Sequence, residues 1–343
     1  MSPDKAQAAN LASSLPYHRL SVVVPMYNEE SLALDLVFSV HAALEDYPCP
    51  WELLVVDDGS TDQTWQRLQY GAQTLGTHVR PIRLWRNFKQ TAAMQAGIDA
   101  ARGDVIVTLD GDLQNDPRDI PKLVERLLCE QLDLVAGWRE HRQDGFWLRK
   151  LPSRLANILI RRVSGLPFQD LGCSLKAFRA SVLRKIRLYG EMHRFIPAWL
   201  ATVTSPQRMA EEPVRHQPRT KGQSKYGISR TLRVMVDLVS MYYFMRFGTR
   251  PGHFFGGLGL LVLGSGLAML SYLGALKIMG DSIGTRPLLF LGFFCVLGGL
   301  QFLTTGVLAE MLMRTYFDGG KWPAYHQELE PSLGAQEGWH VRS

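Results

Sequence analysis

The sequence predicts an α/β fold with a mostly parallel sheet, followed by two transmembrane helices. Short runs of β-branched and aliphatic residues alternate with amphipathic helical segments, a pattern typical of parallel strands covered by helices on both faces. Acidic side chains follow two of these runs directly, as expected where strands end at a ligand-binding edge. Two apolar segments, 254–276 and 288–308, are each long enough to cross a bilayer core.

The individual elements follow from local patterns. Runs of β-branched and aliphatic residues predict strands at 20–25, 51–56, 82–85, 105–109 and 134–137. Helical periodicity predicts helices at 30–47, 90–101 and 117–129, and a further helix begins at the capping cluster Ser60, Thr61 and Asp62. Farther along, we interpret 168–180 as a strand that carries Asp170 at its start, 193–200 as an apolar helix, and 211–227 as a strand followed by a basic loop.

The composition allows a full hydrophobic core and favours a membrane over nucleic acid as the partner. The chain has 343 residues, 46% of them hydrophobic, and a net charge of +6. Most basic residues lie between Arg139 and Arg250, without interleaved aromatic residues, a helix-turn-helix, an RNA-recognition signature or zinc-ligand spacing. We therefore expect an anionic membrane surface to meet this region.

Cysteine spacing and the N-terminus both indicate a cytoplasmic setting. The four cysteines form no C-x-x-C pair, which predicts neither a zinc site nor a disulfide framework. Residues 1–18 are polar and lack an apolar core, so we expect a disordered N-terminus that is not a secretory signal.

Acidic residues at two strand ends predict a metal site. Asp110, Asp112 and Gln114 follow the strand at 105–109, while Asp57 and Asp58 end the strand at 51–56. Neighbouring carboxylates repel each other unless a cation lies between them, and hard oxygen ligands suit Mg²⁺ or Mn²⁺ bound to a diphosphate. A solvated turn is the alternative for an isolated Asp-x-Asp, but the second acidic strand end favours the metal site.

Motifs of other nucleotide-binding classes do not occur. No G-x-G-x-x-G follows any of the first strands, and no G-x-x-x-x-G-K-[ST] is present. This argues against a dinucleotide oxidoreductase and a P-loop enzyme, and it leaves the phosphate to be held by metal.

Two basic regions complete the pattern. The amphipathic stretch 139–165 places Phe146, Trp147 and Leu148 beside Arg149, which suits a membrane interface, although a solvated helix packed on the domain fits this stretch equally well. The glycine-containing loop in 211–227 can close over a diphosphate by charge attraction, with a solvated loop as the alternative. Its cationic residues are Arg215, His216, Arg219, Lys221 and Lys225.

The first strand, 20–25, is also followed by polar residues, since Tyr27, Asn28 and Glu29 come soon after Pro25. The three strand ends resemble the nucleotide-sugar pocket of family 2 glycosyltransferases with the GT-A fold, a Rossmann-like and mostly parallel architecture. From about Leu20 to Tyr316 the chain is similar to polyprenyl-phosphate glycosyltransferases of the dolichol-phosphate mannose synthase type. This resemblance implies transfer of a sugar from a nucleotide-sugar donor, with UDP-sugars favoured, to undecaprenyl or dolichyl phosphate, with inversion at the anomeric carbon. The product would be a lipid-linked monosaccharide.

The resemblance also assigns site residues, motif by motif. It implies a catalytic pair, Asp112 and Asp170, and a Mg²⁺ or Mn²⁺ site made of Asp110, Asp112 and Gln114. Acceptor phosphate would be bound by Arg139, Arg149 and Ser153, of which the last two lie four residues apart and share a face if helical. The nucleotide would be held by Pro25, Tyr27, Glu29, Asp57, Asp110, Arg215, Arg219 and Lys225.

The predicted organisation places the catalytic edge at the cytoplasmic membrane. We expect a disordered segment 1–18, a GT-A domain 19–227, an amphipathic interfacial helix 228–250, two transmembrane helices within 251–315 and a cytoplasmic tail 316–343. Basic residues flank the outer ends of both spans, so the positive-inside rule leaves both termini and the catalytic domain on the cytoplasmic side of the inner membrane. Glycine-rich spans favour close helix packing and are compatible with a homo-oligomer.

Two alternative functions are weighed against this one. A processive polysaccharide synthase of the same superfamily would carry a Q-x-x-R-W motif, which does not occur, and two spans are few for a polymer channel. A non-enzymatic membrane scaffold would not need acids at the strand ends.

Overall fold

The computed structural model describes residues 15–139, 168–216, 242–243, 246–247 and 250–318. The chain divides into two compact units, Met1–Leu238 and Val239–Ser343. The expected interfacial helix 228–250 and most of the basic stretch 139–165 lie outside the described residues, as does nearly all of the tail 316–343. Within the segment expected to precede the fold, His18 is buried and shares a 2.6 Å hydrogen bond with the Tyr47 hydroxyl.

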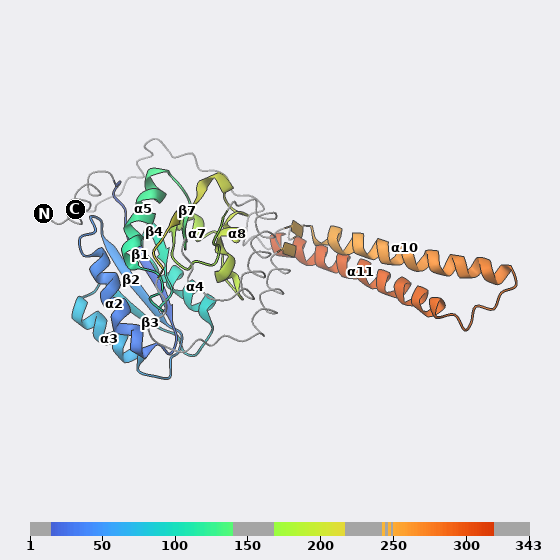
Figure 1. Ribbon diagram of the computed structural model, residues 1–343, viewed down its shortest axis with the longest axis horizontal. Helices are drawn as coiled ribbons and strands as arrows, with labels where there is room; N and C mark the ends of the chain where they lie inside the picture. The colour runs from blue at the N-terminus through green and yellow to red at the C-terminus, as the bar shows by residue number, and fades with distance from the viewer. Residues whose placement is uncertain (1–14, 140–167, 217–241, 244–245, 248–249, 319–343) are drawn as a thin grey trace. The chain divides into compact units, whose positions relative to one another are not determined.

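The first unit is built on a mixed, mostly parallel sheet, as the sequence predicts (Figure 1). Within the described residues seven strands occur in the order β3-β2-β1-β4-β6-β5-β7. Parallel pairing joins β3 to β2, β2 to β1, β1 to β4 and β5 to β7, whereas β6 runs antiparallel to both its neighbours. The strands are β1 Leu20–Met26, β2 Trp51–Asp57, β3 Val79–Arg83, β4 Val105–Thr108, β5 Leu134–Trp138, β6 Lys176–Arg179 and β7 Met209–Pro213.

Helices cover both faces of this sheet. The core that contains Val22, Val24 and Leu53 packs against α2, α3 and α5, while α4 covers the opposite face, where Gly97 lies against Val23. All seven residues of β1 are buried, as expected for a central strand covered on both sides. The helices are α2 Glu30–Leu44, α3 Thr64–Leu75, α4 Gln90–Ala100, α5 Ile120–Cys129, α7 Ala180–Leu183 and α8 Ile196–Leu200, with 3₁₀ turns at Pro117–Asp119, Met192–Phe195 and Pro206–Arg208.

Two strands differ from the sequence prediction. The third strand begins earlier than predicted, because Val79 is buried and pairs with Leu53, whereas Trp85 is fully exposed. The predicted strand 168–180 is wrong at its start, since β6 is confined to Lys176–Arg179. Asp170 lies in the preceding turn, where its amide donates to a carboxylate oxygen of the Glu211 side chain and not to a backbone carbonyl of a paired strand.

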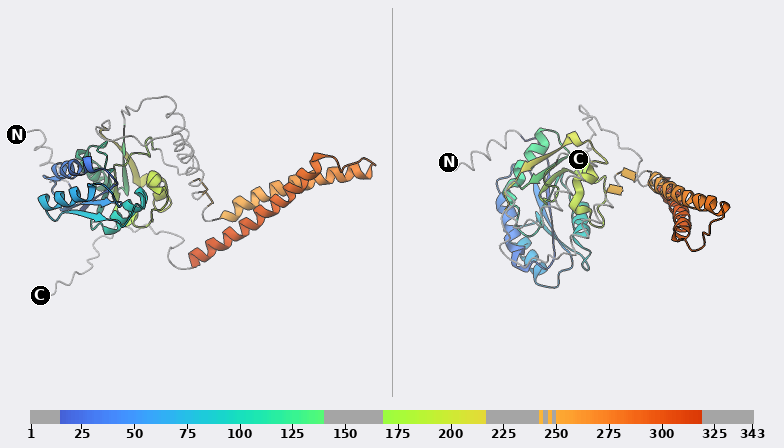
Figure 2. Two further views of the ribbon diagram at one scale, coloured as in Figure 1. Left: turned by 90° about the horizontal axis from the view of Figure 1, so that it is seen from below. Right: turned by 45° about the vertical axis from the view of Figure 1, so that its right-hand side comes forward.

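The second unit is an antiparallel pair of long apolar helices. Helix α10 spans Pro251–Ile278 and α11 spans Pro287–Asp318, and both are long and apolar enough to cross a membrane. Figures 1 and 2 show the two helices side by side. Their outward faces carry large exposed apolar side chains, including Leu260, Leu261, Phe293 and Phe294, a surface suited to lipid.

Glycines recur every seven residues along the contact between these helices. Gly252, Gly259 and Gly266 line α10, and Gly292, Gly299 and Gly306 line α11. A Cβ on Gly266 would lie 2.8 Å from the Gly292 carbonyl oxygen, so the backbones are too close for larger residues. This confirms the close helix packing predicted from the glycine content.

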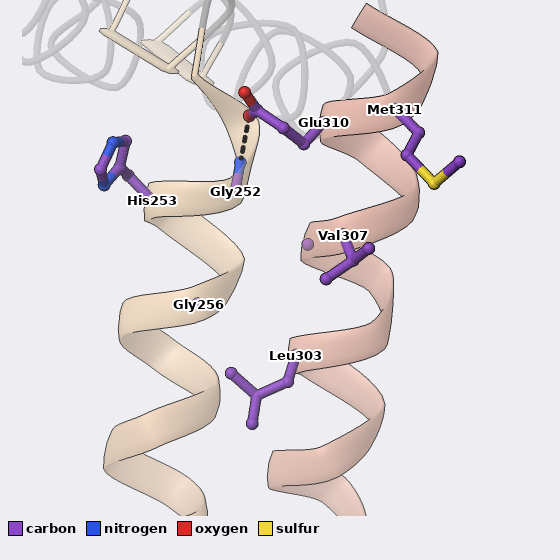
Figure 3. Close-up of a pocket in the computed structure, with 8 residues that line it drawn as sticks. Gly252, His253, Gly256, Leu303, Val307, Glu310 and Met311 are labelled. Atoms are coloured by element: carbon purple, nitrogen blue, oxygen red, sulfur yellow. Dashed lines mark hydrogen bonds between the residues drawn. The ribbon is translucent and has the colours of Figure 1, made fainter. Parts of the chain in front are cut away.

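A groove of about 550 Å³ lies between the start of α10 and the end of α11. Gly256, Leu303, Val307 and Met311 contribute its apolar lining. The Glu310 side chain points to the first turn of α10, where its Oε2 accepts a 3.3 Å hydrogen bond from the Gly252 amide (Figure 3). A carboxylate at this place satisfies an amide that has no partner within its own helix.

Replacing Gly299 by alanine should weaken the helix pair, because the new Cβ would lie 2.5 Å from the Leu263 amide nitrogen. Gly298→Ala is the matched control, since a Cβ there meets nothing within 4 Å. Both changes raise helix propensity equally, so the difference in stability between the two variants reports the steric contact at Gly299. Overpacking of this kind costs about 1 to 3 kcal/mol. We expect only Gly299→Ala to unfold at a lower temperature, or at a lower concentration of denaturing detergent, than the unmodified protein. Circular dichroism would follow the loss of helix. Equal unfolding of the two variants would contradict the packing.

Candidate active site

The carboxyl ends of β1, β2 and β4 meet at one edge of the sheet. Met26 pairs with Asp57 in the β1–β2 register, and Val23 pairs with Thr108 in the β1–β4 register. Asp110 therefore lies level with Pro25, and a Cβ on the next residue, Gly111, would be 3.2 Å from the Pro25 carbonyl oxygen. The structure thus brings together the three strand ends that the sequence predicts as a pocket.

The loops after β1 and β2 are tied to each other by side-chain hydrogen bonds. The Asn28 amide donates to the Ser60 hydroxyl at 2.9 Å, and the Thr61 amide donates to the Asn28 side-chain oxygen at 2.9 Å. The Glu29 amide donates to the Thr64 hydroxyl at 3.0 Å. Half-buried Tyr27 and Glu29 are therefore presented from a backbone that is fixed at several points.

The two acids that end β2 have different environments. Asp57 is fully buried; one oxygen accepts from the Ser60 amide, and the other lies 3.6 Å from Arg83 Nε with no hydrogen-bond partner in the described part of the chain. Asp58 accepts from the amides of Phe88 and Lys89 at 2.7 and 2.9 Å. Burial raises the pKa of the Asp58 carboxyl, against the effect of these two hydrogen bonds.

Asp58 thus anchors the segment that joins β3 to α4. Gly59 permits this close approach, because its φ is +67° and a Cβ would lie 2.5 Å from the Arg86 carbonyl carbon. The anchored segment leads to Gln90 at the start of α4, whose Nε2 donates to Asp110 Oδ1 at 2.7 Å. A residue of the third βα unit, β3–α4, therefore positions the acid that follows β4.

Asp110 is held in an environment that favours its neutral form. Its amide donates to the Ser174 hydroxyl at 3.3 Å, and its carboxylate receives the Gln90 hydrogen bond. Burial, followed by the charge of Asp112, raises the pKa of Asp110 to about 6, although Lys176 and Arg139 act in the opposite direction. A divalent cation between the two carboxylates would remove this repulsion.

The turn after β4 supplies oxygen ligands that fit a hard cation. Asp112 Oδ1 accepts from the Gln114 amide at 3.2 Å, and the intervening Leu113 has a φ of 56°. In the part of the chain that the structure describes, no group of three or more His, Cys, Asp and Glu residues forms a metal site. A cation on Asp110 and Asp112 would therefore complete its shell with neutral oxygens such as the Gln114 amide, with water, or with oxygens of a bound diphosphate.

Arg139 and Asp170, predicted to contact the acceptor and the reacting sugar, are paired with each other. Arg139 donates from Nε at 2.6 Å and from Nη2 at 3.0 Å to the two Asp170 oxygens, and both side chains are 12% exposed. Glu211 fixes the Asp170 backbone, since its oxygens accept from the Gln169 and Asp170 amides at 2.7 and 2.8 Å. This bidentate pair places a rigid, nearly neutral unit beside Asp110.

Arg215 is fixed near the acidic turn by its backbone. Its amide donates to Asp119 Oδ2 at 2.7 Å, and its guanidinium lies 3.7 Å from Asp116 and 3.8 Å from Asp119. The side chain is 66% exposed, so its end remains accessible to an anion. Arg149, Ser153, Arg219 and Lys225 lie outside the described residues.

The sequence pattern of glycosyl transferase family 2 matches residues 21–187. A dodecaprenyl-phosphate galacturonate synthase from Rhizobium johnstonii is 53% identical over 307 residues, which cover 89% of this chain and 91% of the relative. The chain belongs to glycosyl transferase family 2. This glycosyltransferase is therefore an enzyme, and the alternative of a non-enzymatic scaffold does not hold.

Further comparisons agree with this membership. An undecaprenyl-phosphate 4-deoxy-4-formamido-L-arabinose transferase from Pseudomonas aeruginosa is 35% identical over 320 residues, 91% of this chain and 90% of the relative. Among solved structures, glucosyl-3-phosphoglycerate synthase from Mycobacterium tuberculosis, in complex with Mn²⁺, UDP and glucosyl-3-phosphoglycerate, has a TM-score of 0.53. It shares 20% identity and covers 70% of this chain and 83% of its own, which supports the GT-A fold.

Several residues of this glycosyltransferase site were missed by sequence reasoning. Gln90, Ser174, Lys176 and Glu211 all contact or surround the acids that were predicted. Lys176 carried a usable signal, because a lone lysine in the apolar run LKAF is unusual in a buried strand. Glu211 carried none, since its role depends on a contact between segments far apart in the sequence.

Replacing Asp110 by asparagine should stabilise the metal-free enzyme above neutral pH. A carboxyl whose folded pKa is raised binds its proton more tightly when folded, so its contribution to stability falls as pH rises from about 4 to about 6 and stays low above that. The substituted amide would keep an oxygen that can accept from Gln90 but would carry no charge. We expect a gain of up to about 3 kcal/mol at about pH 8 and little at about pH 4.

The measurement is chemical unfolding in detergent with a metal chelator, at both pH values. Asp104→Asn, on a side chain that is 58% exposed, controls for the loss of a surface charge. A variant less stable than wild type at the higher pH would contradict the repulsion described for Asp110.

Proposed function

We propose that this enzyme transfers a sugar from a nucleotide-sugar donor to polyprenyl phosphate, with a nucleotide-linked galacturonate as the first candidate donor. The observation that carries the proposal is the 53% identity to the dodecaprenyl-phosphate galacturonate synthase across 89% of the chain. Only 250 residues precede α10, so the match extends into the apolar helices. The likeness thus includes the part of the chain that would meet a lipid, which favours a lipid acceptor over a growing polysaccharide.

The strand ends would bind the donor. Pro25, Tyr27, Glu29 and Asp57 surround the place where a nucleoside would lie, and their loops are fixed before any ligand arrives. Asp110, Asp112 and Gln114 would hold Mg²⁺ or Mn²⁺, which when bound neutralises the diphosphate as the bond to the sugar breaks. Two carboxylates and a diphosphate supply the hard oxygens that these ions prefer.

The acceptor phosphate would be bound by Arg139 together with Arg149 and Ser153. Its oxygen is already anionic, so attack on the anomeric carbon needs no strong base. One carbon–oxygen bond forms on the lipid phosphate as the bond to the nucleoside diphosphate breaks, with inversion. Asp170 would orient Arg139 and sugar hydroxyls, because a carboxylate in a bidentate pair with arginine is a poor proton acceptor.

The leaving diphosphate would be stabilised by Arg215, Arg219 and Lys225. The Arg215 backbone is fixed by Asp119 while its side chain stays exposed, an arrangement that limits where the charge can move. Preorganised cations of this kind act where negative charge accumulates during the reaction.

The two apolar helices would place this chemistry at the membrane. We propose an inner-membrane enzyme with the domain organisation predicted from the sequence and with both termini and the catalytic domain in the cytoplasm. The basic residues at the outer ends of the spans, Arg250 and Arg314, support this orientation. Donor sugar nucleotides and the lipid phosphate would then meet at headgroup depth.

The purified enzyme should form lipid-linked sugar from polyprenyl phosphate, Mn²⁺ and the correct nucleotide-sugar. The test is a panel of UDP- and GDP-linked sugars, including uronic acids and neutral hexoses, with product detected by mass spectrometry. We expect UDP-galacturonate to give the fastest transfer and Asp112→Ala to give none while it remains folded. Transfer to sugar polymer, or full activity of Asp112→Ala, would overturn the proposal.

Arg149→Ala should raise the KM for polyprenyl phosphate much more than the KM for the donor. The lost charge-assisted hydrogen bond corresponds to about 1.5 to 3 kcal/mol, or roughly ten- to a hundredfold in kcat/KM. Arg118→Ala, on an exposed residue outside the proposed acceptor group, is the matched control. An effect confined to donor KM would assign Arg149 to the nucleotide side.

A further inference from the structure

Lys176 is a buried lysine in the strand next to β4. It is 2% exposed, and it lies in β6 directly opposite Thr108 of β4. Opposed residues in an antiparallel pair share a face of the sheet, and Asp110 follows Thr108 by two positions. The Lys176 side chain therefore lies on the sheet face that leads to Asp110, consistent with the electrostatic interaction between the two groups.

Neighbouring hydrogen bonds hold this region rigid. The Thr108 hydroxyl donates to the Ser174 carbonyl oxygen at 2.9 Å, and the Ser174 hydroxyl accepts from the Asn115 side chain at 2.8 Å and from the Asp110 amide. The Lys176 ammonium donates to the Cys173 carbonyl oxygen. Lys176 therefore has little freedom to move toward a substrate, and it would act through its charge on Asp110.

A neutral side chain with an N–H group could also donate to the Cys173 carbonyl oxygen, so this hydrogen bond alone does not require a lysine. Burying an ammonium is costly, and burial lowers the pKa of Lys176 against the attraction of Asp170 and Asp110. Asp170 already has Arg139 as its partner, so it does not need a second cation. The remaining effect of the charge is on Asp110 and on whatever binds to it.

A divalent ion at Asp110 and Asp112 would be attracted by two carboxylates and repelled by Lys176. Because solvent screens this buried region poorly, the repulsion is stronger than it would be in water. We propose that Lys176 is a positioning residue that keeps the affinity of the Asp110–Asp112 site for a divalent ion low until a nucleoside diphosphate adds its own oxygens. The inference rests on the proposed function, since it takes these two acids as metal ligands.

The consequence is coupled binding of metal and donor. Free metal would not saturate the empty site, whereas the negative diphosphate would overcome the effect of Lys176 and supply the missing ligands. After transfer, departure of the diphosphate would again leave the metal weakly held. Lys176 would thus help to release product as well as to admit the donor complex.

The test is Mn²⁺ binding to the detergent-solubilised full chain without nucleotide, measured by electron paramagnetic resonance. Lys176→Met removes the charge and the donor, while Lys176→Gln removes the charge and keeps an N–H donor for Cys173. We expect both to bind Mn²⁺ about tenfold or more tightly than wild type, as for loss of a nearby buried like charge. With UDP present, the variants should differ much less from wild type.

Several outcomes would overturn the inference. Unchanged or weaker Mn²⁺ binding in both variants would do so. Wild-type affinity in Lys176→Gln, with tighter binding only in Lys176→Met, would also do so, because it would show that Lys176 acts through its hydrogen bond and not through its charge. Asp112→Ala gives the baseline for binding elsewhere. If neither neutral variant folds, the test is the effect of UDP on Mn²⁺ binding to the wild-type enzyme. We expect UDP to tighten Mn²⁺ binding by about tenfold or more, and an effect below about threefold would reject the inference.

The same data separate this inference from the proposed function. If wild type does not bind Mn²⁺ at Asp112 even with UDP, the metal assignment itself fails. If it does, and neutral variants without UDP match wild type, only the role of Lys176 fails.

Discussion

Burial and mutual repulsion of the carboxylates that follow β4 are the constraint around which the catalytic edge is built. Burial, followed by the charge of Asp112, raises the pKa of Asp110 to about 6, so the surrounding fold disfavours the ionised form of Asp110 in the metal-free site. Gln90 and Ser174 fix the turn from two other segments, and Gly111 lets the turn lie close to Pro25. Such stored strain is expected where a ligand must supply the missing charge.

Three other acids near this edge are held by partners within the protein. Asp58 is bound by two backbone amides, Asp170 by Arg139, and Asp119 by the Arg215 amide. These interactions convert carboxylates into anchors for loops, which leaves the Asp110–Asp112 pair as the acids best suited to a cation. Selectivity for one proposed metal position would therefore depend as much on the pairing of neighbouring acids as on the ligands themselves.

Local patterns predicted the parts of the fold that depend on local chemistry. The buried strands, the acids that follow them and the two apolar helices were correct because period, β-branching and segment length are visible in the sequence. The start of β6 was wrong because Glu211, which lies 42 and 41 residues farther along the chain, takes the Gln169 and Asp170 amides. The Arg139–Asp170 pair could not be predicted for the same reason. Arg139 was predicted to bind the acceptor phosphate and Asp170 to lie beside the sugar, and only the fold shows that the two side chains bind each other.

That pair also bears on how the proposed reaction would proceed. A carboxylate that accepts two hydrogen bonds from arginine holds its charge and binds a proton weakly, so Asp170 is poorly suited to act as a base. An anionic lipid phosphate would not require one. The barrier would then lie mainly in separating the sugar from the diphosphate, and the features that lower it would be a cation at Asp110 and Asp112 and the exposed guanidinium of Arg215. An active centre in which Asp170 is already paired with arginine and two neighbouring carboxylates, Asp110 and Asp112, could share a cation suits stabilisation of a leaving diphosphate better than proton abstraction.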